Sequence, residues 1–535
     1  MQRIFWNPIT ALLAAACLRL FFLLKFPAGS GDAVVYEQIA TNWLQHHVFA
    51  MNIGDSLVPV DLRMPGYPAF LALVYALTGR TGEAARFFVG IAQILMDLLT
   101  CVTIGAFAAL LALLARPRPV LRDVYMAALW LAALCPFTAH YVAVPLTETW
   151  AVFFTAVALV VLSLLVSRAC DFPGNSLTGS YLLNGFREGT ALAVPKSSRN
   201  SGILTPEVVR TVGQSNSEIG FSRSASSVDF RILAALSGFT VGLGTLFRPE
   251  TPLLLIVAFL VLAYLLLRAG AYRRLLLSCT IMLCGFAVPV LPWMIRNAIT
   301  LHEFQPLAPK DTMLPGEVDP KGFLAWERTW LYRFRDCYLV SWKLNGEEIR
   351  LQDLPSSAFD TDEERNRVAE VLEKYNNELT WTAEQDAAFA QLARERTARH
   401  PVRTYLWIPL RRAARMWFTP RIELLPFSGN VFPLAYMREE DPVDQRVTIA
   451  YFFLNIIYVV LGVAGAWKLW RYPGARPAVA FIILYILIRT AFLTTLETPE
   501  PRYVLVCFPA LIAFAAQLFQ RNTPWPDYAS SAGSG

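Results

Sequence analysis

Long apolar runs constrain this chain more than any other feature. A helix needs about 20 apolar residues to cross the hydrocarbon core of a bilayer, and ten segments approach or exceed that length. They are 8–27, 84–114, 122–141, 145–167, 231–247, 251–268, 273–293, 448–468, 477–495 and 502–520. A further apolar segment, 66–79, is short and predicts a re-entrant or interfacial helix. We therefore predict an all-α polytopic membrane protein with about ten spans.

Composition agrees with a membrane protein. Of the residues, 55% are hydrophobic and 16% are charged, against about a quarter charged in soluble domains. The net charge of +6 gives no argument for nucleic-acid binding, because the arginines lie mainly between the apolar runs. The cysteines form no CxxC pair, so we expect them to be buried apolar residues. The first run contains Arg19 and lacks a cleavage site, which predicts an uncleaved helix.

The basic residues between the runs predict how the chain is oriented. They cluster in three short loops: Arg116, Arg118 and Arg122; Arg268, Arg273 and Arg274; Lys468, Arg471 and Arg476. Basic loops stay on the cytoplasmic side, which places both termini there in a multi-pass plasma (inner) membrane protein. The outer side then receives 28–83, 142–144, 248–250, 294–447 and 496–501.

This reading divides the chain into six parts. They are an N-terminal transmembrane region 1–167 with a first outer loop 28–83, an insert 168–230, a transmembrane region 231–296, an extracytoplasmic and mainly helical domain 297–447, a C-terminal transmembrane region 448–520, and a cytoplasmic tail 521–535. The insert is rich in Ser, Gly, Asn and Thr, which predicts a disordered cytoplasmic segment.

The domain 297–447 carries helix signals of its own. Thr361-x-x-Glu364 and Thr382-x-x-Gln385 are capping boxes, which predict helices near 362–377 and 383–399. Residues 402–418 mix large apolar side chains with arginines, a pattern typical of a helix at the lipid headgroups.

The first outer loop holds two candidates for chemistry. Asp32 lies just beyond the first span, before a surface helix predicted at 34–44. Its carboxylate could deprotonate an acceptor hydroxyl, or it could simply cap that helix. Arg63 precedes the restricted stretch Pro65–Pro68 and could bind a phosphate through two parallel hydrogen bonds, or it could anchor the interface beside Tyr67.

More ionisable residues fall on the same predicted side, each beside a proline. They are Glu148, the pair Arg248 and Glu250, Arg296, and Arg502 with Tyr503. Such residues often only mark the interface, but several on one side indicate a site. Arg19, Asp97 and Arg489 lie inside spans, where charges are costly and are usually paired or functional. We expect Arg19 and Asp97 to form a structural ion pair, with a double charge swap retaining the fold that a single change loses.

The order of these features resembles the GT-C glycosyltransferases, in particular glycosyltransferase family 39, the protein O-mannosyltransferase and lipid A aminoarabinose transferase group. The matching residues are Arg19-Leu20; Asp32, Tyr36 and Ala40; Arg63 to Pro68; Thr147-Glu148; Arg248-Pro249-Glu250; Pro292 to Asn297; and Arg502-Tyr503. The resemblance covers most of the chain except 168–230 and much of 300–400. It rests on the order and shared side of the motifs rather than on any one of them.

The resemblance implies an inverting transfer of a sugar from a polyprenyl-phosphate donor to a lipid, glycan or protein acceptor outside the cytoplasm. Asp32 would act as general base, with Glu148 as the second catalytic residue. We assign donor-phosphate binding to Arg63, Arg248, Arg296 and Arg502, and the substrate pocket to Tyr36, Glu37, Tyr67, Glu250 and Tyr503. Many members carry a second acid directly after the catalytic Asp. Here that residue is Ala33, so we expect no tightly held metal and no cofactor.

Two other functions stay open at this point. A transporter or flippase of lipid-linked saccharides would have pseudo-symmetric halves and broken helices near the bilayer midplane. A non-catalytic scaffold would use 297–447 as a binding module and would leave the grouping of Asp32, Arg63, Glu148 and Arg502 without a purpose. The sequence does not identify the sugar or the acceptor.

Overall fold

The computed structural model describes residues 7–29, 31–115, 120–170, 229–309, 317–432 and 434–520. Nearly all of the predicted insert and the whole tail 521–535 lie outside these residues. Within them the chain is helical apart from one two-stranded antiparallel hairpin, β1 (Ala50–Ile53) and β2 (Ser56–Pro59). The predicted all-α membrane class is therefore confirmed.

Most of the predicted spans correspond to long apolar helices. Among the described residues seven helical segments are long and apolar enough to cross a membrane. They are α2 (Pro8–Lys25), η1 with α5 (Gly82–Ala85 and Arg86–Ala115), α8 (Glu148–Cys170), α12 (Tyr272–Thr300), α19 (Pro442–Trp470), α20 (Arg476–Thr494), and η8, α21 and η9 together (Pro501–Cys507, Phe508–Ala516 and Gln517–Phe519).

The other three predicted spans are either bent or too short to cross the membrane as a single straight helix. The segment 122–141 is a bent pair, α6 (Leu121–Ala133) followed by α7 (Pro136–Ala139) and η2 (His140–Ala143), with a bend of 51°. Pro136 explains the break, because it has no N–H to continue the helix. Two more, α10 (Phe230–Thr245) and α11 (Leu253–Arg268), have 16 residues each, or about 24 Å, less than the roughly 30 Å apolar core.

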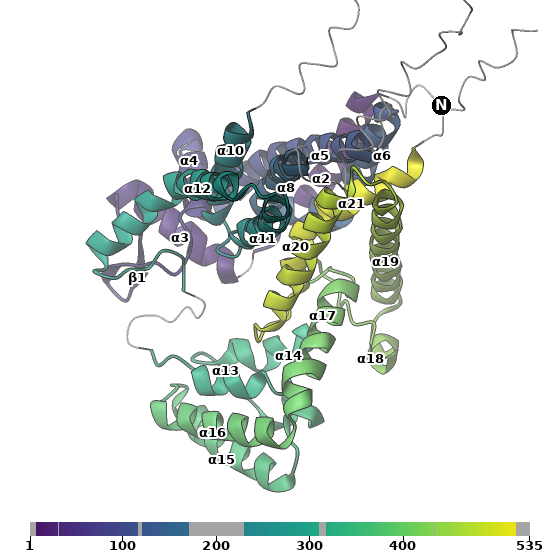
Figure 1. Cartoon of the computed structure of the whole chain (residues 1–535). Helices are drawn as coiled ribbons and strands as arrows, with labels where there is room; N and C mark the ends of the chain where they lie inside the picture. The colour runs from purple at the N-terminus through teal and green to yellow at the C-terminus, as the bar shows by residue number, and fades with distance from the viewer. Residues whose placement is uncertain are drawn as a thin grey trace, which may run out of the picture.

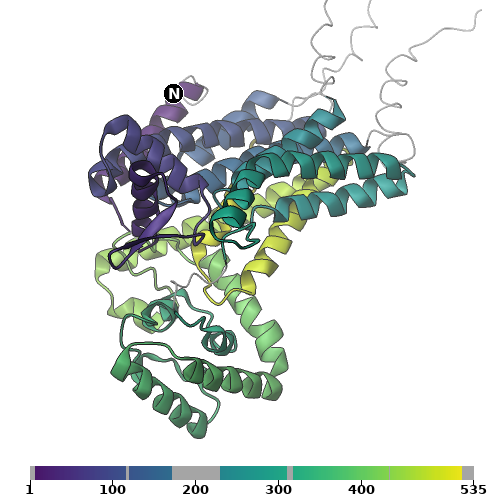
Figure 2. The same cartoon turned by 90° about the vertical axis from the view of Figure 1, so that its left-hand side faces the viewer.

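A second helical group lies beyond the membrane helices and meets them through its last helix, as Figures 1 and 2 show. It comprises α13 (Lys321–Glu327), α14 (Phe334–Leu339), η4 (Ser341–Lys343), η5 (Leu351–Asp353), η6 (Ser356–Ala358), α15 (Asp362–Glu378), α16 (Ala383–Arg399), η7 (Arg403–Trp407) and α17 (Ile408–Phe418). We call it the α13–α17 domain. Its own core includes Phe323, Trp326, Trp381 and Phe389, so it folds around apolar packing separate from the bundle. The short helix α18 (Leu434–Glu439) leads on to α19.

The two predicted capping boxes start α15 and α16. At Thr382 both halves of the box are present, since Gln385 and Thr382 exchange hydrogen bonds with each other's main-chain N–H. At Thr361 the hydroxyl accepts from the N–H of Glu364, but the Glu364 carboxylate accepts from the N–H of Asp360 (2.6 Å). The second bond is therefore shifted by one residue.

The predicted amphipathic helix at 402–418 is present, with a π-helical start in η7. Tyr405 and Trp407 are exposed, as a headgroup helix would have them. Arg412 differs, because it is 2% exposed and donates to the main-chain carbonyls of Leu331 (2.8 Å) and Thr494 (3.1 Å). It therefore connects the α13–α17 domain to the end of a membrane helix.

The first outer loop folds into α3 (Gly31–His46), the β1–β2 hairpin and α4 (Gly66–Thr78). The short α4 is the apolar segment predicted at 66–79, and it packs on α3 through Tyr67 and Tyr36, whose rings are 5.1 Å apart. The hairpin was not predicted. Its turn uses Gly54 at a positive φ, which glycine adopts without a steric cost.

Candidate active site

Asp32 lies in the first turn of α3 between two arginines from distant parts of the chain. Arg63 Nη2 donates to Asp32 Oδ1 (2.8 Å), and Arg502 Nη2 donates to Asp32 Oδ2 (2.9 Å). Arg63 comes from residues 60–65, which join β2 to α4 and which we call the strap. Arg502 lies in η8, next to the last membrane helix. The structure thus brings together the carboxylate and the two guanidiniums that the sequence placed on one side of the membrane.

From Asp32 a chain of alternating charges runs into the bundle. Arg502 lies 3.6 Å from Glu148, in the first turn of α8, and Glu148 forms a close ion pair with Arg248. Arg248 is 3.8 Å from Glu250, which pairs with Arg489 of α20 at 3.0 Å. Arg489 was singled out only as a charge inside a span. Its partner explains how that charge is tolerated there.

The charges of this cluster balance. Its carboxylates are Asp32, Glu148, Glu250 and Glu500, and its guanidiniums are Arg63, Arg248, Arg489 and Arg502. Asp32 is the most exposed of these acids at 34%, whereas Glu148 is 2% exposed. An anion that enters the cluster must therefore compete with a carboxylate already present, and Asp32 is the accessible one.

The arginines lower the pKa of the acids at the two ends of the cluster, Asp32 and Glu250. Burial opposes ionisation of Asp32, but Arg502 and Arg63 outweigh it and hold the pKa of Asp32 below its ordinary value. Burial likewise opposes ionisation of Glu250, and Arg248 with Arg489 lowers its pKa. Asp32 is consequently ionised at neutral pH and is a weak base while both arginines hold it.

Aromatic rings and a close main-chain contact fix the strap that carries Arg63. The Arg63 guanidinium lies 5.7 Å from the centre of the Tyr36 ring. The N–H of Gly66 donates to the carbonyl of Leu246 at 2.7 Å, and a Cβ on Gly66 would lie 2.6 Å from that oxygen. The strap is thereby joined directly to the turn that carries Arg248.

Tyr67 and Tyr503 line this region from two sides. The Tyr67 hydroxyl donates to Gln93 Oε1 (2.9 Å), and Gln93 in turn donates to the carbonyls of Val142 and Val144. The Tyr503 hydroxyl donates to Glu500 (2.7 Å), and its ring lies below the guanidiniums of Arg248 and Arg502.

Two predicted site residues form their hydrogen bonds outside the cluster. Glu37 forms a two-point ion pair with Arg86 of α5, at 2.8 and 3.0 Å. Arg296 donates to the carbonyls of Val60 and Phe49, both at 2.8 Å, and so holds the ends of the hairpin. Their assignments as pocket and phosphate-binding residues remain predictions, and these contacts give each of them a structural role.

Glu500, which stands with Pro501 directly before Arg502 on the predicted outer side, contacts both Arg502 and Tyr503. Sequence reasoning missed two other residues near the cluster, Glu423 and Gln93. Glu423, in the loop after α17, accepts from the hydroxyl of Tyr141 (2.8 Å), and burial raises its pKa despite the nearby Arg421 and Arg502. Glu423 is a single acid in an irregular loop and has no local motif. Gln93 had a signal, because it is an amide inside a long apolar run, four residues before Asp97.

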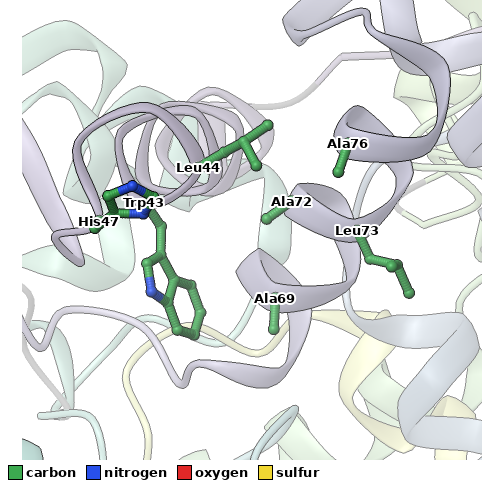
Figure 3. Close-up of a pocket in the computed structure, with 7 residues that line it drawn as sticks. All are labelled: Trp43, Leu44, His47, Ala69, Ala72, Leu73 and Ala76. Atoms are coloured by element: carbon green, nitrogen blue, oxygen red, sulfur yellow. The ribbon is translucent and has the colours of Figure 1, made fainter.

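An apolar cavity of about 330 Å³ opens between α3 and α4, on the elements that carry Asp32 and Tyr67. Figure 3 shows Trp43, Leu44 and His47 on one side and the side chains of α4 on the other. It is lined by Trp43, Leu44, His47, Ala69, Ala72, Leu73 and Ala76. Within the described ranges no group of three or more His, Cys, Asp or Glu side chains is arranged to hold a metal ion.

Comparison with known proteins gives matches among solved structures alone. No family model matches the chain, and no curated protein matches it. The solved structures that resemble it are glycosyltransferases of the GT-C fold. One is the oligosaccharyltransferase AglB from Archaeoglobus fulgidus with an inhibitory peptide and a dolichol-phosphate, at TM-score 0.43 and 13% identity over 95% of this chain and 50% of that chain.

The same enzyme tethered to an acceptor peptide gives TM-score 0.45 and 12% identity, over 95% of this chain and 49% of that one. ArnT from Cupriavidus metallidurans bound to undecaprenyl phosphate gives TM-score 0.33 and 13% identity, over 95% and 77%. This chain spans about half the length of AglB. At these identities and TM-scores the likeness adds no weight to any assignment of function, which rests on the site itself.

Proposed function

We propose that this protein is a membrane glycosyltransferase that moves a sugar from a polyprenyl-phosphate donor to a hydroxyl of a lipid, glycan or protein acceptor on the extracytoplasmic face. One observation carries the proposal: a single accessible carboxylate, Asp32, is shared by Arg63 and Arg502 beside the membrane helices. A base and a phosphate-binding pair are the two components that such a transfer needs.

In this mechanism the donor phosphate displaces Asp32 as the hydrogen-bond partner of Arg63 and Arg502. Two guanidiniums suit the phosphate oxygens better than one carboxylate, because each can donate two parallel hydrogen bonds. Once Arg63 and Arg502 bind the phosphate, the pKa of Asp32 rises toward its ordinary value. Asp32 then becomes a competent base only when the donor is present.

The transfer itself is a displacement at the anomeric carbon. The acceptor hydroxyl loses its proton to Asp32 as its oxygen bonds to that carbon, and the bond from the carbon to the phosphate oxygen breaks on the opposite face, which inverts the configuration. Charge grows on the departing phosphate, where Arg63 and Arg502 stabilise it most in the transition state. Glu148 lies 3.6 Å from Arg502 and is itself paired with Arg248.

The apolar cavity between α3 and α4 supports a lipid-linked donor. Its lining is alanine, leucine and the apolar parts of Trp43 and His47, which match isoprenoid units chemically. Trp43 follows Asp32 by 11 residues of α3, or about 17 Å along the helix, so a tail in this cavity would have to extend along α3 for its phosphate to reach the two arginines.

The bent pair α6–α7 is the feature of the described residues that favours the alternative of a lipid-linked saccharide transporter, since broken helices bind substrates in transporters. The carbonyls at this break are already occupied. Ala132 O and Ala133 O both accept from Arg19, so the break offers no free main-chain ligands from these two residues, and we favour the transferase.

The test is transfer of a labelled sugar from polyprenyl phosphate in proteoliposomes. We expect Asp32→Asn to lower kcat by about 10²–10⁴-fold, the range for loss of a general base. Asp55→Asn, an exposed acid in the hairpin turn of the same loop, should leave the rate unchanged. Equal rates for Asp32→Asn and the unmodified protein would remove Asp32 as the base.

A second test separates phosphate binding by Arg63 from the role of Asp32 as a base. It measures binding of sugar-free polyprenyl phosphate as a shift in the protein's melting temperature. Arg63→Gln should abolish the shift. Asp32→Asn should bind polyprenyl phosphate more tightly than the unmodified protein, because it removes the competing carboxylate. Weaker binding by Asp32→Asn would contradict the exchange of Asp32 for phosphate.

A further inference from the structure

Arg502 depends for its position on a segment with little regular structure. After α20 ends at Thr494, the chain runs irregularly to Pro501, where η8 begins. Thr495 is exposed, but Glu497 and Glu500 are each 4% exposed, so the part of the segment from Glu497 onward is mostly buried. Whatever holds the segment 495–501 therefore also sets where the Arg502 guanidinium lies.

The α13–α17 domain holds the start of this segment. Arg328, just after α13, forms a close ion pair with Glu497. Arg412 of α17 donates to the carbonyl of Thr494 (3.1 Å) and, with another nitrogen, to the carbonyl of Leu331 (2.8 Å). One guanidinium thus connects the last residue of α20 with the loop after α13.

The loop that follows α17 holds the end of the segment. Arg421 is fully buried and donates to the carbonyl of Pro501 (2.8 Å), directly before Arg502. The same nitrogen donates to the carbonyl of Met416 (2.9 Å), and another donates to the carbonyl of Trp417 (3.1 Å). Arg421 therefore ties the C-terminal end of α17 to the residue next to the site.

We propose that the α13–α17 domain and the loop behind it form a clamp that positions Arg502 for the donor phosphate, with Arg328, Arg412 and Arg421 as positioning residues. The three arginines act through Thr494, Glu497 and Pro501, which lie at both ends and in the middle of the segment. Loosening the clamp lets Arg502 leave Asp32 and the phosphate position. The expected change in transfer kinetics rests on the proposed function, whereas the expected loosening of the segment 495–501 rests on the contacts alone.

The first experiment compares Arg328→Gln with Arg367→Gln in the full-length protein. Both arginines belong to the α13–α17 domain and pair with a glutamate, at 44% and 42% exposure, but Arg328 pairs with Glu497 in the segment 495–501, whereas Arg367 pairs with Glu395 within the domain. We expect amide hydrogen exchange in 495–503 to become faster in Arg328→Gln and to stay unchanged in Arg367→Gln. Equal exchange in Arg328→Gln and the unmodified protein would overturn the clamp.

The second experiment measures transfer kinetics. A misplaced Arg502 should raise KM for the polyprenyl-phosphate sugar by about tenfold or more, while KM for the acceptor stays within error. Arg328→Lys, which keeps the charge, should recover most of the loss. A matching rise in both KM values, or no recovery by Lys, would indicate a general structural defect and overturn the positioning role.

A double variant tests the pair directly. If Arg328 acts through Glu497, then Arg328→Gln combined with Glu497→Gln should be no worse than the more impaired single variant. Additive losses would contradict the proposal. If the unmodified protein transfers no sugar at all, the proposed function is wrong, whereas the exchange data still decide whether the domain holds the segment.

Discussion

Three buried arginines, Arg19, Arg412 and Arg421, share one task, which is to satisfy main-chain carbonyls where helices end. Arg19 donates to Ala132 and Ala133 at the end of α6, Arg412 to Thr494 at the end of α20, and Arg421 to Met416 and Trp417 at the end of α17. The last carbonyls of a helix have no partner within it and carry partial negative charge. A guanidinium, with five donors in a fork, suits several of them at once.

This role changes what is expected of the buried pair Arg19–Asp97. The predicted pair is confirmed, with Arg19 Nε donating to Asp97 Oδ2 at 2.6 Å and side-chain exposures of 0% and 2%. Because Arg19 also serves two carbonyls, an aspartate at position 19 would face oxygen atoms rather than a cation. The charge swap is therefore no longer expected to restore the fold.

We expect Arg19→Leu to destabilise the protein by about 3–5 kcal/mol, the usual result of removing one partner of a buried pair. The swap Arg19→Asp with Asp97→Arg should remain at least as unstable. The measurement is the thermal midpoint in detergent micelles. A swapped protein as stable as the original would show that the carbonyl contacts are unimportant.

Elements were more predictable than their irregular connections. Periodicity and capping boxes gave α15 and α16 nearly to the residue, and length gave most of the spans. The bend after α6 follows from Pro136, and a proline within a run is a visible signal. The β1–β2 hairpin was missed because its strands are four residues each and lack the alternation that marks a longer strand.

The candidate site was predictable in part, because several of its residues lie beside the ends of helices that the sequence predicts. Asp32, Arg63, Glu148, Arg248 and Arg502 stand beside helix ends, and their shared side follows from counting spans. Glu423 and the arginines of the clamp come from the α13–α17 domain and its flanking loop, where the sequence gives no distance to the bundle. Side-chain partners such as Arg86 for Glu37 also depend on packing that no local pattern encodes.

At the element scale, the last residue of α13 predicts a pH effect on stability. Burial raises the pKa of Glu327 to about 8, with Glu497 adding to the rise and the hydroxyl of Ser341, which donates at 2.6 Å, opposing it. Between its ordinary pKa near 4.5 and about 8, the folded protein holds a proton that the unfolded chain has lost. Stability therefore falls as pH rises through that window and levels off above it.

Glu327→Gln should remove this dependence, because the amide is neutral at every pH and its oxygen can still accept from Ser341. We expect the two proteins to have similar thermal midpoints near pH 5, with the variant increasingly more stable up to about pH 8. The measurement is a series of melting curves in detergent. Parallel curves across the range would show that Glu327 is ionised in the folded protein.

At the scale of the whole molecule, the predicted orientation places the α13–α17 domain outside the cytoplasm. The first turn of α12, with Arg273, should then face the cytoplasm. In a chain whose own cysteines are replaced, an impermeant maleimide should label Glu384→Cys on intact cells, since this side chain is 87% exposed. Arg273→Cys should react only after the membrane is opened, and the reverse pattern would invert the orientation and move the site to the cytoplasmic face.

The close contact between Gly66 and Leu246 bears on how the proposed transferase could change its substrate. A single added carbon there would collide with Leu246. The strap that carries Arg63 and the turn that carries Arg248 therefore have no room to move closer together. Under the proposed function, room for a bulkier sugar would have to come from the Arg502 side of the cluster, where 495–501 is irregular and is held by the α13–α17 domain. Variation in sugar size among proteins of this design should therefore be found in the holding domain, far from the atoms that react.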